Sequence, residues 1–186
     1  FSQTNVFNQN ISSWNTSSVT NMSSMFQQAL VFNQPLNGWD MTSVTNVSSM
    51  FASASDFNQP LDSWVLSNVT SFQSMFNQAT SFNQDISAWD TTSITNMSSM
   101  FQQATSFDQD LSPWNISGVT NMTNMLSNSG ISQENYDNIL IGWAAQAVLD
   151  NVDLGATNLN YCDGRDARQE LIDDHNWNII GDIVNC

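Results

Sequence analysis

The chain has 186 residues, with 17 acidic and 2 basic side chains, which gives a formal net charge of −15. A nucleic-acid-binding protein needs a basic surface that displaces counterions from phosphates, and this chain contains no lysine. The same charge opposes binding to an anionic membrane, and no apolar run reaches the roughly 18–20 residues that span a bilayer. Hydrophobic residues make up 40% of the chain, so we expect an ordered domain without nucleic-acid binding or membrane insertion.

A repeat of 25 residues dominates the sequence. Tryptophan, phenylalanine, methionine, threonine and glutamine recur at this interval in five copies without insertion or deletion. The tryptophans are Trp14, Trp39, Trp64, Trp89 and Trp114. We therefore divide 7–131 into five full repeats, with a partial repeat at 1–6 because Phe1 stands before Phe7 as equivalent residues do later. A fixed period is typical of solenoids, and a start inside a repeat predicts that the segment belongs to a longer polypeptide.

Within each repeat, the pattern predicts one short strand and one short helix. Residues 84–87 alternate polar and apolar side chains, which is typical of a strand. Apolar residues in 97–104 follow the i, i+3, i+4, i+7 spacing of an amphipathic helix, and Thr95 precedes them where an N-cap would lie. We therefore expect an α/β solenoid, a leucine-rich-repeat-like stack of 25-residue turns.

The repeat ends after Ile131, and 132–186 predicts a C-terminal α/β cap in the same structural domain. Its expected elements are a helix at about 133–147, a strand at 152–156, a helix at 166–175 and a strand at 177–180. We expect this cap to cover the open hydrophobic end of the last repeat.

Two cysteines, Cys162 and Cys186, are the only ones in the chain. An even pair in an acidic, lysine-free chain predicts a disulfide formed in an oxidising compartment. Two unpaired thiols remain an alternative. A metal site with His175 is disfavoured because these residues include no closely spaced ligand pair.

Positions that differ between repeats predict where a ligand binds, because we expect the invariant positions to build the scaffold. The varying positions mix carboxylates with apolar groups, and no lysine or arginine of the repeats pairs with the carboxylates. We expect a ligand-binding edge formed by Asp40, Asp62, Asp85, Asp90 and Asp110. Such an edge suits a peptide or another small extended ligand, and a merely solvated surface is the alternative.

A calcium site is a second hypothesis for this edge. Asp85, Asp108 and Asp110 fall on adjacent turns, where close carboxylates repel one another unless a cation lies between them. Ca²⁺ prefers oxygen ligands, although the spacing is not that of an EF-hand.

Catalysis is not expected. His175 is the only histidine, and neither a nucleophile beside it nor a phosphate-binding glycine loop is evident. Stacked aspartates leave a glycoside hydrolase as an alternative, since such enzymes use two nearby carboxylates. The threonines that recur from Thr20 to Thr120 leave an ice-binding solenoid open as another alternative.

The repeat at 82–106, F-N-Q-D-I-S-A-W-D-T-T-S-I-T-N-M-S-S-M-F-Q-Q-A-T-S, resembles the bacterial surface-protein repeat family related to BspA-like leucine-rich repeats. The segments I-G-W-A-A-Q (141–146) and N-V-D-L-G-A (151–156) are similar to the cap that follows such repeats in marine bacterial surface proteins. The family is associated with exported adhesins, and related modules of large repeats-in-toxin adhesins act as peptide-binding domains. It supplies no catalytic residues.

The resemblance implies a non-catalytic peptide- or protein-binding module of a bacterial surface adhesin. Its expected place is outside the cell, its expected partner is a peptide or protein on another cell surface, and we expect the fragment to be monomeric. A carbohydrate-binding module remains the alternative among binding functions.

Overall fold

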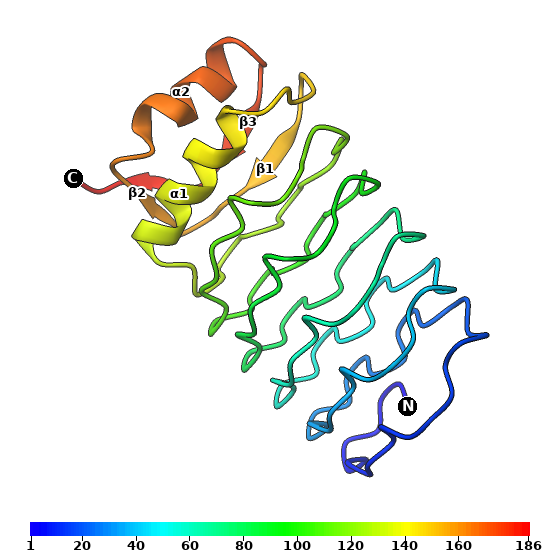
Figure 1. Ribbon diagram of the computed structural model, residues 1–186. Coiled ribbons are helices and arrows are strands. Elements are labelled where there is room, and N and C mark those ends of the chain that lie inside the picture. The colour runs from blue at the N-terminus through cyan, green and yellow to red at the C-terminus, as the bar shows by residue number, and fades with distance from the viewer.

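The computed structural model describes all 186 residues and shows coils of chain stacked along one direction (Figure 1). The N-terminus lies at one end of the stack, and two helices and four short strands lie at the other. These elements are α1 (Gln133–Ala144), β1 (Asp153–Gly155), β2 (Asn160–Tyr161), α2 (Arg165–Asp173), β3 (Asn178–Ile180) and β4 (Ile183–Val184). Neither helix has the length and apolar run that crossing a membrane requires.

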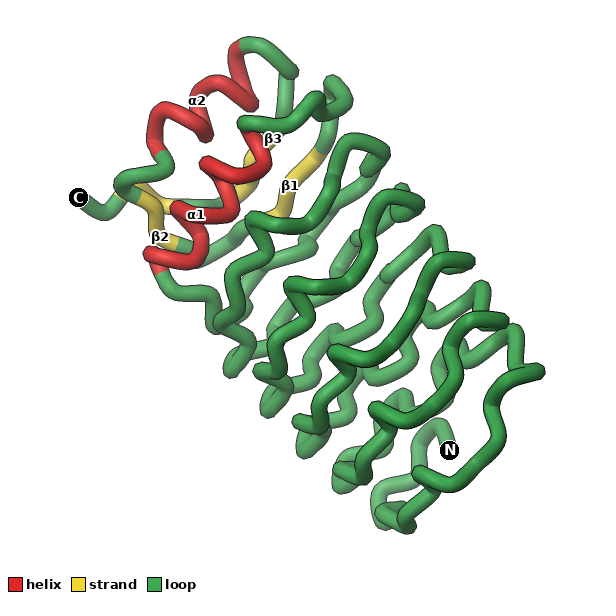
Figure 2. The backbone as a smooth tube through the Cα atoms, viewed as in Figure 1, coloured by secondary structure: helices red, strands yellow, loops and turns green.

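The repeats contain neither helices nor strands, so the strand expected at 84–87 and the helix expected at 97–104 are wrong (Figure 2). Only isolated parallel bridges, such as Asn96 to Asn121, link successive repeats in the manner of a sheet. Thr95 caps no helix, because its hydroxyl donates to the carbonyl oxygen of Thr70 at 3.3 Å.

Consecutive turns take the place of the expected helix. The backbone N–H of Met100 bonds to the carbonyl oxygen of Met97 at 3.2 Å, and the following residues continue such turns. Ser99 and Gln103 have φ values of 54° and 61°, and the third residue of a type II turn requires a positive φ. These turns join residues three apart, at 97–100, 99–102 and 101–104, and the apolar side chains at 97, 100, 101 and 104 are buried as those of a helix would be. The apolar spacing in 97–104 therefore does not distinguish them.

Alternate backbone N–H groups join each coil to the next. Ser99 donates to the carbonyl oxygen of Thr123 at 2.8 Å, and Gln103 donates to that of Ser127 at 2.9 Å. Phe101 between them donates to the carbonyl oxygen of Met125 at 2.9 Å, whereas the N–H groups of Met100 and Gln102 close turns within the coil. Each coil thus satisfies its buried backbone donors partly through itself and partly through its neighbour, so an unpaired coil would be unstable. We call this row of inter-coil bonds the ladder.

Tryptophan indoles add a second set of bonds between coils. The Nε1–H of Trp89 donates to the carbonyl oxygen of Leu61 at 3.0 Å, and that of Trp114 donates to Ile86 at 3.1 Å. In the cap, Trp143 makes the equivalent bond to Leu111 at 3.1 Å. The repeated tryptophan therefore contributes a buried apolar ring, and the hydrogen bond of its N–H fixes the position of that ring.

Successive coils are rotated as well as shifted, so the stack curves. Coils related by translation alone would have the same separation at every position. The ring centroids of Trp64 and Trp89 lie 6.4 Å apart, whereas those of Phe51 and Phe76 lie 5.5 Å apart. Hydrogen-bonded backbones at the ladder are separated by only about 4.8 Å. The ladder therefore lies on the inner, concave side and the tryptophans on the outer side.

The cap continues the ladder beyond the last repeat. Leu126 donates its N–H to the carbonyl oxygen of Gly155 at 2.9 Å, which joins β1 to the final coil. β1 and β3 pair in parallel, with Leu154 opposite Ile179, and β2 and β4 form a second parallel pair. The strands thus extend the stack, while α1 and α2 pack together over its end.

Each element expected in the cap has a counterpart in the structure. The expected helices at 133–147 and 166–175 correspond to α1 and α2, and the expected strands at 152–156 and 177–180 correspond to β1 and β3. Gly142 lets α1 approach the last repeat, because a Cβ atom there would lie 2.6 Å from the Cβ of Ser112.

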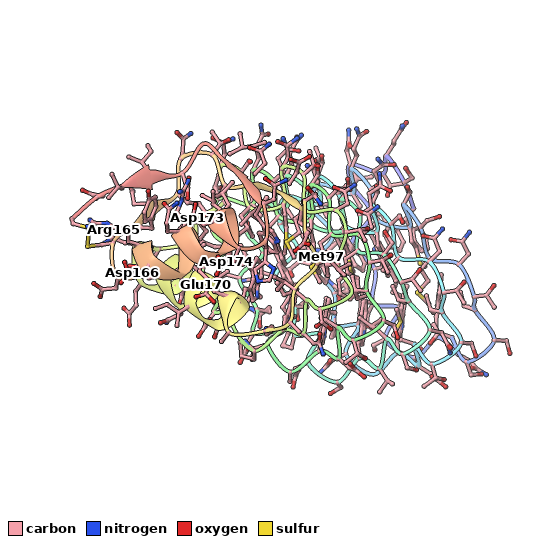
Figure 3. All side chains as sticks on the ribbon, turned by 90° about the horizontal axis from the view of Figure 1, so that it is seen from above. Met97, Arg165, Asp166, Glu170, Asp173 and Asp174 are labelled. Carbon is pink, nitrogen blue, oxygen red and sulfur yellow. A yellow bond between two sulfur atoms is a disulfide. The ribbon has the colours of Figure 1, made fainter.

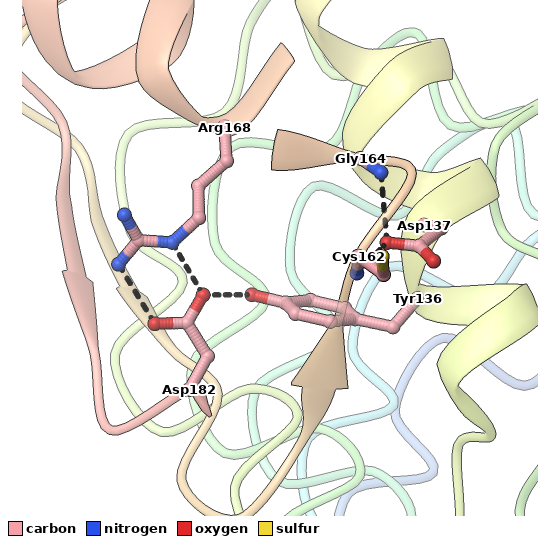
Figure 4. A network of polar contacts seen from close by, with 6 residues as sticks. All are labelled: Tyr136, Asp137, Cys162, Gly164, Arg168 and Asp182. Atoms are coloured by element: carbon pink, nitrogen blue, oxygen red, sulfur yellow. Dashed lines mark hydrogen bonds and ion pairs between the residues drawn. The ribbon is translucent and has the colours of Figure 1, made fainter. Parts of the chain in front are cut away.

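A polar network holds the cap together (Figure 4). Arg168 makes two hydrogen bonds to the carboxylate of Asp182, at 2.6 and 2.8 Å, and Tyr136 donates to the same carboxylate at 3.0 Å. Burial, and then the charge of Asp182, raise the pKa of Tyr136, while the hydrogen bond to Asp182 raises the pKa of Arg168. Tyr136 is therefore neutral and Arg168 charged at neutral pH.

We expect Trp89→Ala to lower the free energy of unfolding by about 3–5 kcal/mol, because it empties a buried site and removes an inter-coil hydrogen bond. Trp14 is the control because its side chain is 48% exposed and its indole makes no hydrogen bond in the protein. Urea denaturation should show a much smaller loss for Trp14→Ala. Equal losses would contradict the stacked packing described above.

The disulfide between Cys162 and Cys186 closes the C-terminal segment of the cap. Its reduction should lower the melting temperature and lower the free energy of unfolding by roughly 3 kcal/mol in the chain-entropy model. Hydrogen exchange should show β2, α2 and β4 losing protection before the repeats. Simultaneous loss of protection throughout the chain would contradict this order.

Candidate ligand-binding groove

Four of the five aspartates predicted to bind a ligand fix local turns. The Oδ1 atom of Asp90 accepts hydrogen bonds from the N–H and hydroxyl of Thr92 at 3.0 and 2.7 Å, and Asp40 makes the same bonds to Thr42. Asp85 and Asp110 each accept from the N–H two residues ahead, at 2.9 and 2.8 Å. Asparagines at equivalent positions in other repeats make the same turn.

Asp62 lies between two coils, where its Oδ1 accepts from Nδ2 of Asn37 at 2.9 Å. All five aspartates therefore have a structural role that explains their position without a ligand. That they also contact one stays a prediction.

Hydrogen bonding keeps several of these carboxylates ionised. The hydroxyl of Thr92, followed by its backbone N–H, lowers the pKa of Asp90, and Thr42 has the same effect on the pKa of Asp40. The backbone N–H of Ser87 is the main cause that lowers the pKa of Asp85.

Asp108 lies at the end of a row of asparagine side chains that runs along the stack. In this row, Oδ1 of Asn83 accepts from the N–H of Asp108 at 2.9 Å and from Nε2 of Gln109 at 2.7 Å. The same two bonds to the next coil are made by Asn8, Asn33 and Asn58. Asp108 in turn accepts from the N–H of Ser132 at 2.7 Å and from Nδ2 of Asn135 at 2.8 Å. It therefore joins the last repeat to the start of α1.

The structure does not assemble Asp85, Asp108 and Asp110 into a calcium site. No group of three or more acidic, histidine or cysteine side chains in the molecule could hold a metal ion. The carboxylate of Asp108 is turned toward the cap, and those of Asp85 and Asp110 are bound to their own turns. The proposed metal residues thus have different partners, and the calcium hypothesis is not supported by their geometry.

The recurring threonines bind backbone carbonyls of the preceding coil. The hydroxyl of Thr45 donates to the carbonyl oxygen of Thr20 at 3.1 Å, and that of Thr120 donates to Thr95 at 3.1 Å. His175 lies 3.1 Å from the carboxylate of Asp150 on the surface of the cap. Neither arrangement places a nucleophile beside a base.

A groove of about 590 Å³ crosses the repeats beside the ladder. Its lining residues are Leu30, Ser53, Ser55, Gln78, Thr80, Gln103, Thr105 and Asn128. They form two rows with the 25-residue period, one of amides and serine and one of hydroxyls with a terminal leucine. None of them is charged, although the chain as a whole carries a net charge of −15.

The turns of the ladder position the first row of the groove. Ser53, Gln78, Gln103 and Asn128 all have φ between 58° and 61° at the third position of their turns. Their backbone N–H groups bond to the next coil, as in the bond from Gln78 to Gln102 at 2.8 Å. The groove therefore lies beside the concave side of the stack, on a rigid hydrogen-bonded base.

Several side chains of the groove have unused hydrogen-bonding capacity. Gln78 and Gln103 are exposed, and their amides make no hydrogen bond within the protein. Thr105 is likewise exposed, while the hydroxyl of Thr80 donates to the carbonyl oxygen of Ser55 at 3.4 Å. Each free glutamine amide offers two donors and one carbonyl acceptor.

The sequence analysis did not identify this groove, although its two rows differ between repeats and read Gln28, Ser53, Gln78, Gln103, Asn128 and Leu30, Ser55, Thr80, Thr105. The adjacent glutamines in Q-Q-A-T at 102–105 were the available signal. Gln102 accepts from Asn77 at 3.1 Å and is structural, whereas Gln103 is free. Only the positive φ of Gln103 separates the two, and that angle is not evident from the sequence.

A second hollow, of about 420 Å³, lies beside α1 in the cap. The carboxylate of Asp137 reaches it but accepts hydrogen bonds from the N–H groups of Cys162 and Gly164 (Figure 4), and from that of Asp163. That carboxylate fixes the segment between β2 and α2. Further acidic side chains, including Asp166 and Glu170, project from α2 (Figure 3).

Residues 1–80 and 62–153 match the model of a family described as "Mycoplasma protein of unknown function, DUF285". The chain belongs to this family. The two matches overlap at 62–80, as expected for a repeated unit, and together they contain every residue of the groove. The chain has no significant match among curated proteins.

Asp108 should make the stability of the protein sensitive to acid. Burial raises its pKa, but hydrogen bonds from Ser132 and Asn135 outweigh burial, so the pKa lies below its ordinary value of 3.8. The carboxylate therefore contributes stability above pH 3.8, and this contribution is lost as the pH falls through the lowered pKa. Urea denaturation between pH 7 and pH 2.5 should show a smaller acid loss for Asp108→Asn, because an amide oxygen accepts the same bonds without titrating.

Asp108→Ala is the matched comparison. It removes the acceptor at every pH, so it should destabilise the protein by about 1–2 kcal/mol at neutral pH, where Asp108→Asn changes little. Identical profiles for the two variants would contradict the role of Asp108 in joining the last repeat to α1.

Proposed function

We propose that this chain is a non-catalytic ligand-binding module of an exported bacterial surface adhesin, with repeats of the BspA-like kind, and that it binds peptide or protein segments in the groove. The observation that carries the proposal is the row of free amides and hydroxyls along the concave side. Its place is outside the cell, which accords with the disulfide between Cys162 and Cys186.

The backbone of the groove supports a binding role. A positive φ is least costly for glycine, so folding alone favours glycine at Gln78 and Gln103. Both positions instead carry long polar side chains that bond to nothing within the protein. Amides held at regular intervals on a rigid base are suited to bind a ligand without much further ordering.

The groove also favours binding over catalysis. Serine and threonine hydroxyls line it, but no histidine, carboxylate or lysine lies among the lining residues to activate them. It contains no pair of carboxylates of the kind a glycoside hydrolase uses.

The central experiment is a screen of peptide and glycan arrays with wild-type protein and the double variant Gln78→Gly/Gln103→Gly. Glycine relieves the left-handed backbone, so we expect the variant to be as stable as wild type or up to about 1 kcal/mol more stable. Hits on the arrays should nevertheless be lost, because the two free amides are gone.

Two control variants make this experiment specific. Ser74→Gly/Ser99→Gly changes residues with φ of 54° in the same coils but outside the groove, so it should retain every hit. Asp85→Asn/Asp110→Asn keeps the turns and removes two charges of the predicted acidic edge. Loss of binding only in this aspartate variant would place the ligand on that edge and contradict the groove.

A further inference from the structure

We infer that the groove binds a neutral polypeptide segment in the polyproline II conformation, an inference that rests on the binding function proposed above. It is carried by the spacing of the groove's polar groups, by their chemistry and by the kind of side chain that the groove lacks.

The spacing of the coils matches the period of a polyproline II helix. Coils at the ladder repeat about every 4.8 Å, so two coils span about 9.6 Å. A polyproline II helix has three residues per turn and rises about 3.1 Å per residue, so one turn spans about 9.3 Å. A segment lying along the stack would therefore present the same face to every second coil.

An extended β-strand lacks this match. Its side chains repeat every two residues, or about 6.7 Å, which equals neither one coil nor two. A β-strand along the groove would lose its register within two or three coils. The flat rows would then contact different parts of the peptide at each coil.

The amide row divides into two sets that suit the three-residue period. Along the stack the order is Ser53, Gln78, Gln103 and Asn128. Ser53 and Gln103 are therefore two coils apart, and so are Gln78 and Asn128. Polyproline II segments make no internal backbone hydrogen bonds, so their carbonyl groups are free to accept from side-chain amides and hydroxyls. Each set can bond the same face of successive turns of the ligand.

The ends of the groove limit the length of the segment. From Ser53 to Asn128 the row covers three intervals of about 4.8 Å, which corresponds to about five residues of polyproline II. Leu30 is 39% exposed at the first end and suits an apolar ligand residue. At the other end, Asn158 donates to Oδ1 of Asn128 at 2.6 Å and belongs to the cap.

The lining determines which segments fit. With no charged residue in the groove, a charged ligand side chain would have no partner there. With no aromatic residue, the groove lacks the flat apolar surface that proline rings and sugar rings pack against. The groove therefore forms hydrogen bonds with the carbonyl and amide groups of a neutral, polar segment. The prolines of such a segment hold it in the polyproline II conformation.

Fluorescence anisotropy with labelled nine-residue peptides tests the inference. A neutral peptide of alanine and glutamine with proline at every third position is compared with peptides carrying glycine or valine at those positions. A proline at every third position can start at the first, second or third residue of the peptide, so all three versions are made. The best phase should bind about tenfold more tightly than the glycine peptide, because proline removes conformational freedom before binding. The valine peptide should bind no better than the glycine peptide.

A substitution scan of the best peptide gives the signature of the conformation. Replacing each residue in turn by aspartate should weaken binding with a period of three residues. Affinity should also rise with peptide length to about five or six residues and then stay constant. Gln78→Gly/Gln103→Gly should abolish the binding, and Ser74→Gly/Ser99→Gly should retain it.

Each other outcome overturns the inference. A period of two residues would indicate an extended strand, and tight binding only of array glycans would indicate a carbohydrate ligand. In both cases the groove would still be a binding site. If no peptide binds but another ligand is lost from the glutamine variant, the ligand class is wrong. If no ligand depends on the two glutamines, the proposed function fails with it.

Discussion

The hydrogen-bonded ladder between coils is the constraint on which the rest of the structure depends. Half of the backbone N–H groups in each turn segment have no acceptor within their own coil, so the next coil must supply one at a fixed position. Trp89 adds the same requirement on the outer side through its bond to Leu61. One inserted residue would shift both sets of donors at once. This explains why five repeats keep a period of 25 residues without insertion or deletion.

The sequence predicted the parts of the structure that depend on burial. The period, the apolar positions and the elements of the cap follow from hydrophobic spacing, which identifies the residues that face a core. The local conformation of the repeats could not be predicted in this way. Residues 97–104 have the spacing of a helix, but Ser99 and Gln103 adopt a positive φ so that alternate N–H groups point to the next coil. This choice is made by the neighbouring coil, not by local propensity.

The acidic edge predicted from the sequence has a structural explanation of a related kind. Variation between repeats predicts a ligand edge, but at the position of Asp85 and Asp110 the residues that alternate are Asn, Pro and Asp. All three favour turns, and Asp85 and Asn10 accept the same hydrogen bond from the residue two positions ahead. The exchange of Asn and Asp at this position therefore reflects interchangeable ways of making one turn.

The same geometry that stabilises the stack also gives the groove its form. Some of the ladder donors, including Gln78 and Gln103, have a left-handed conformation, and their side chains are exposed. Neighbouring coils are closest at the ladder and further apart at the tryptophans, and the amides lie beside the ladder. Spacing, polarity and rigidity of the groove thus arise from the bonds that hold the coils together. A change that loosened the ladder would alter the spacing of the amides before it unfolded the core, and so would affect recognition before stability.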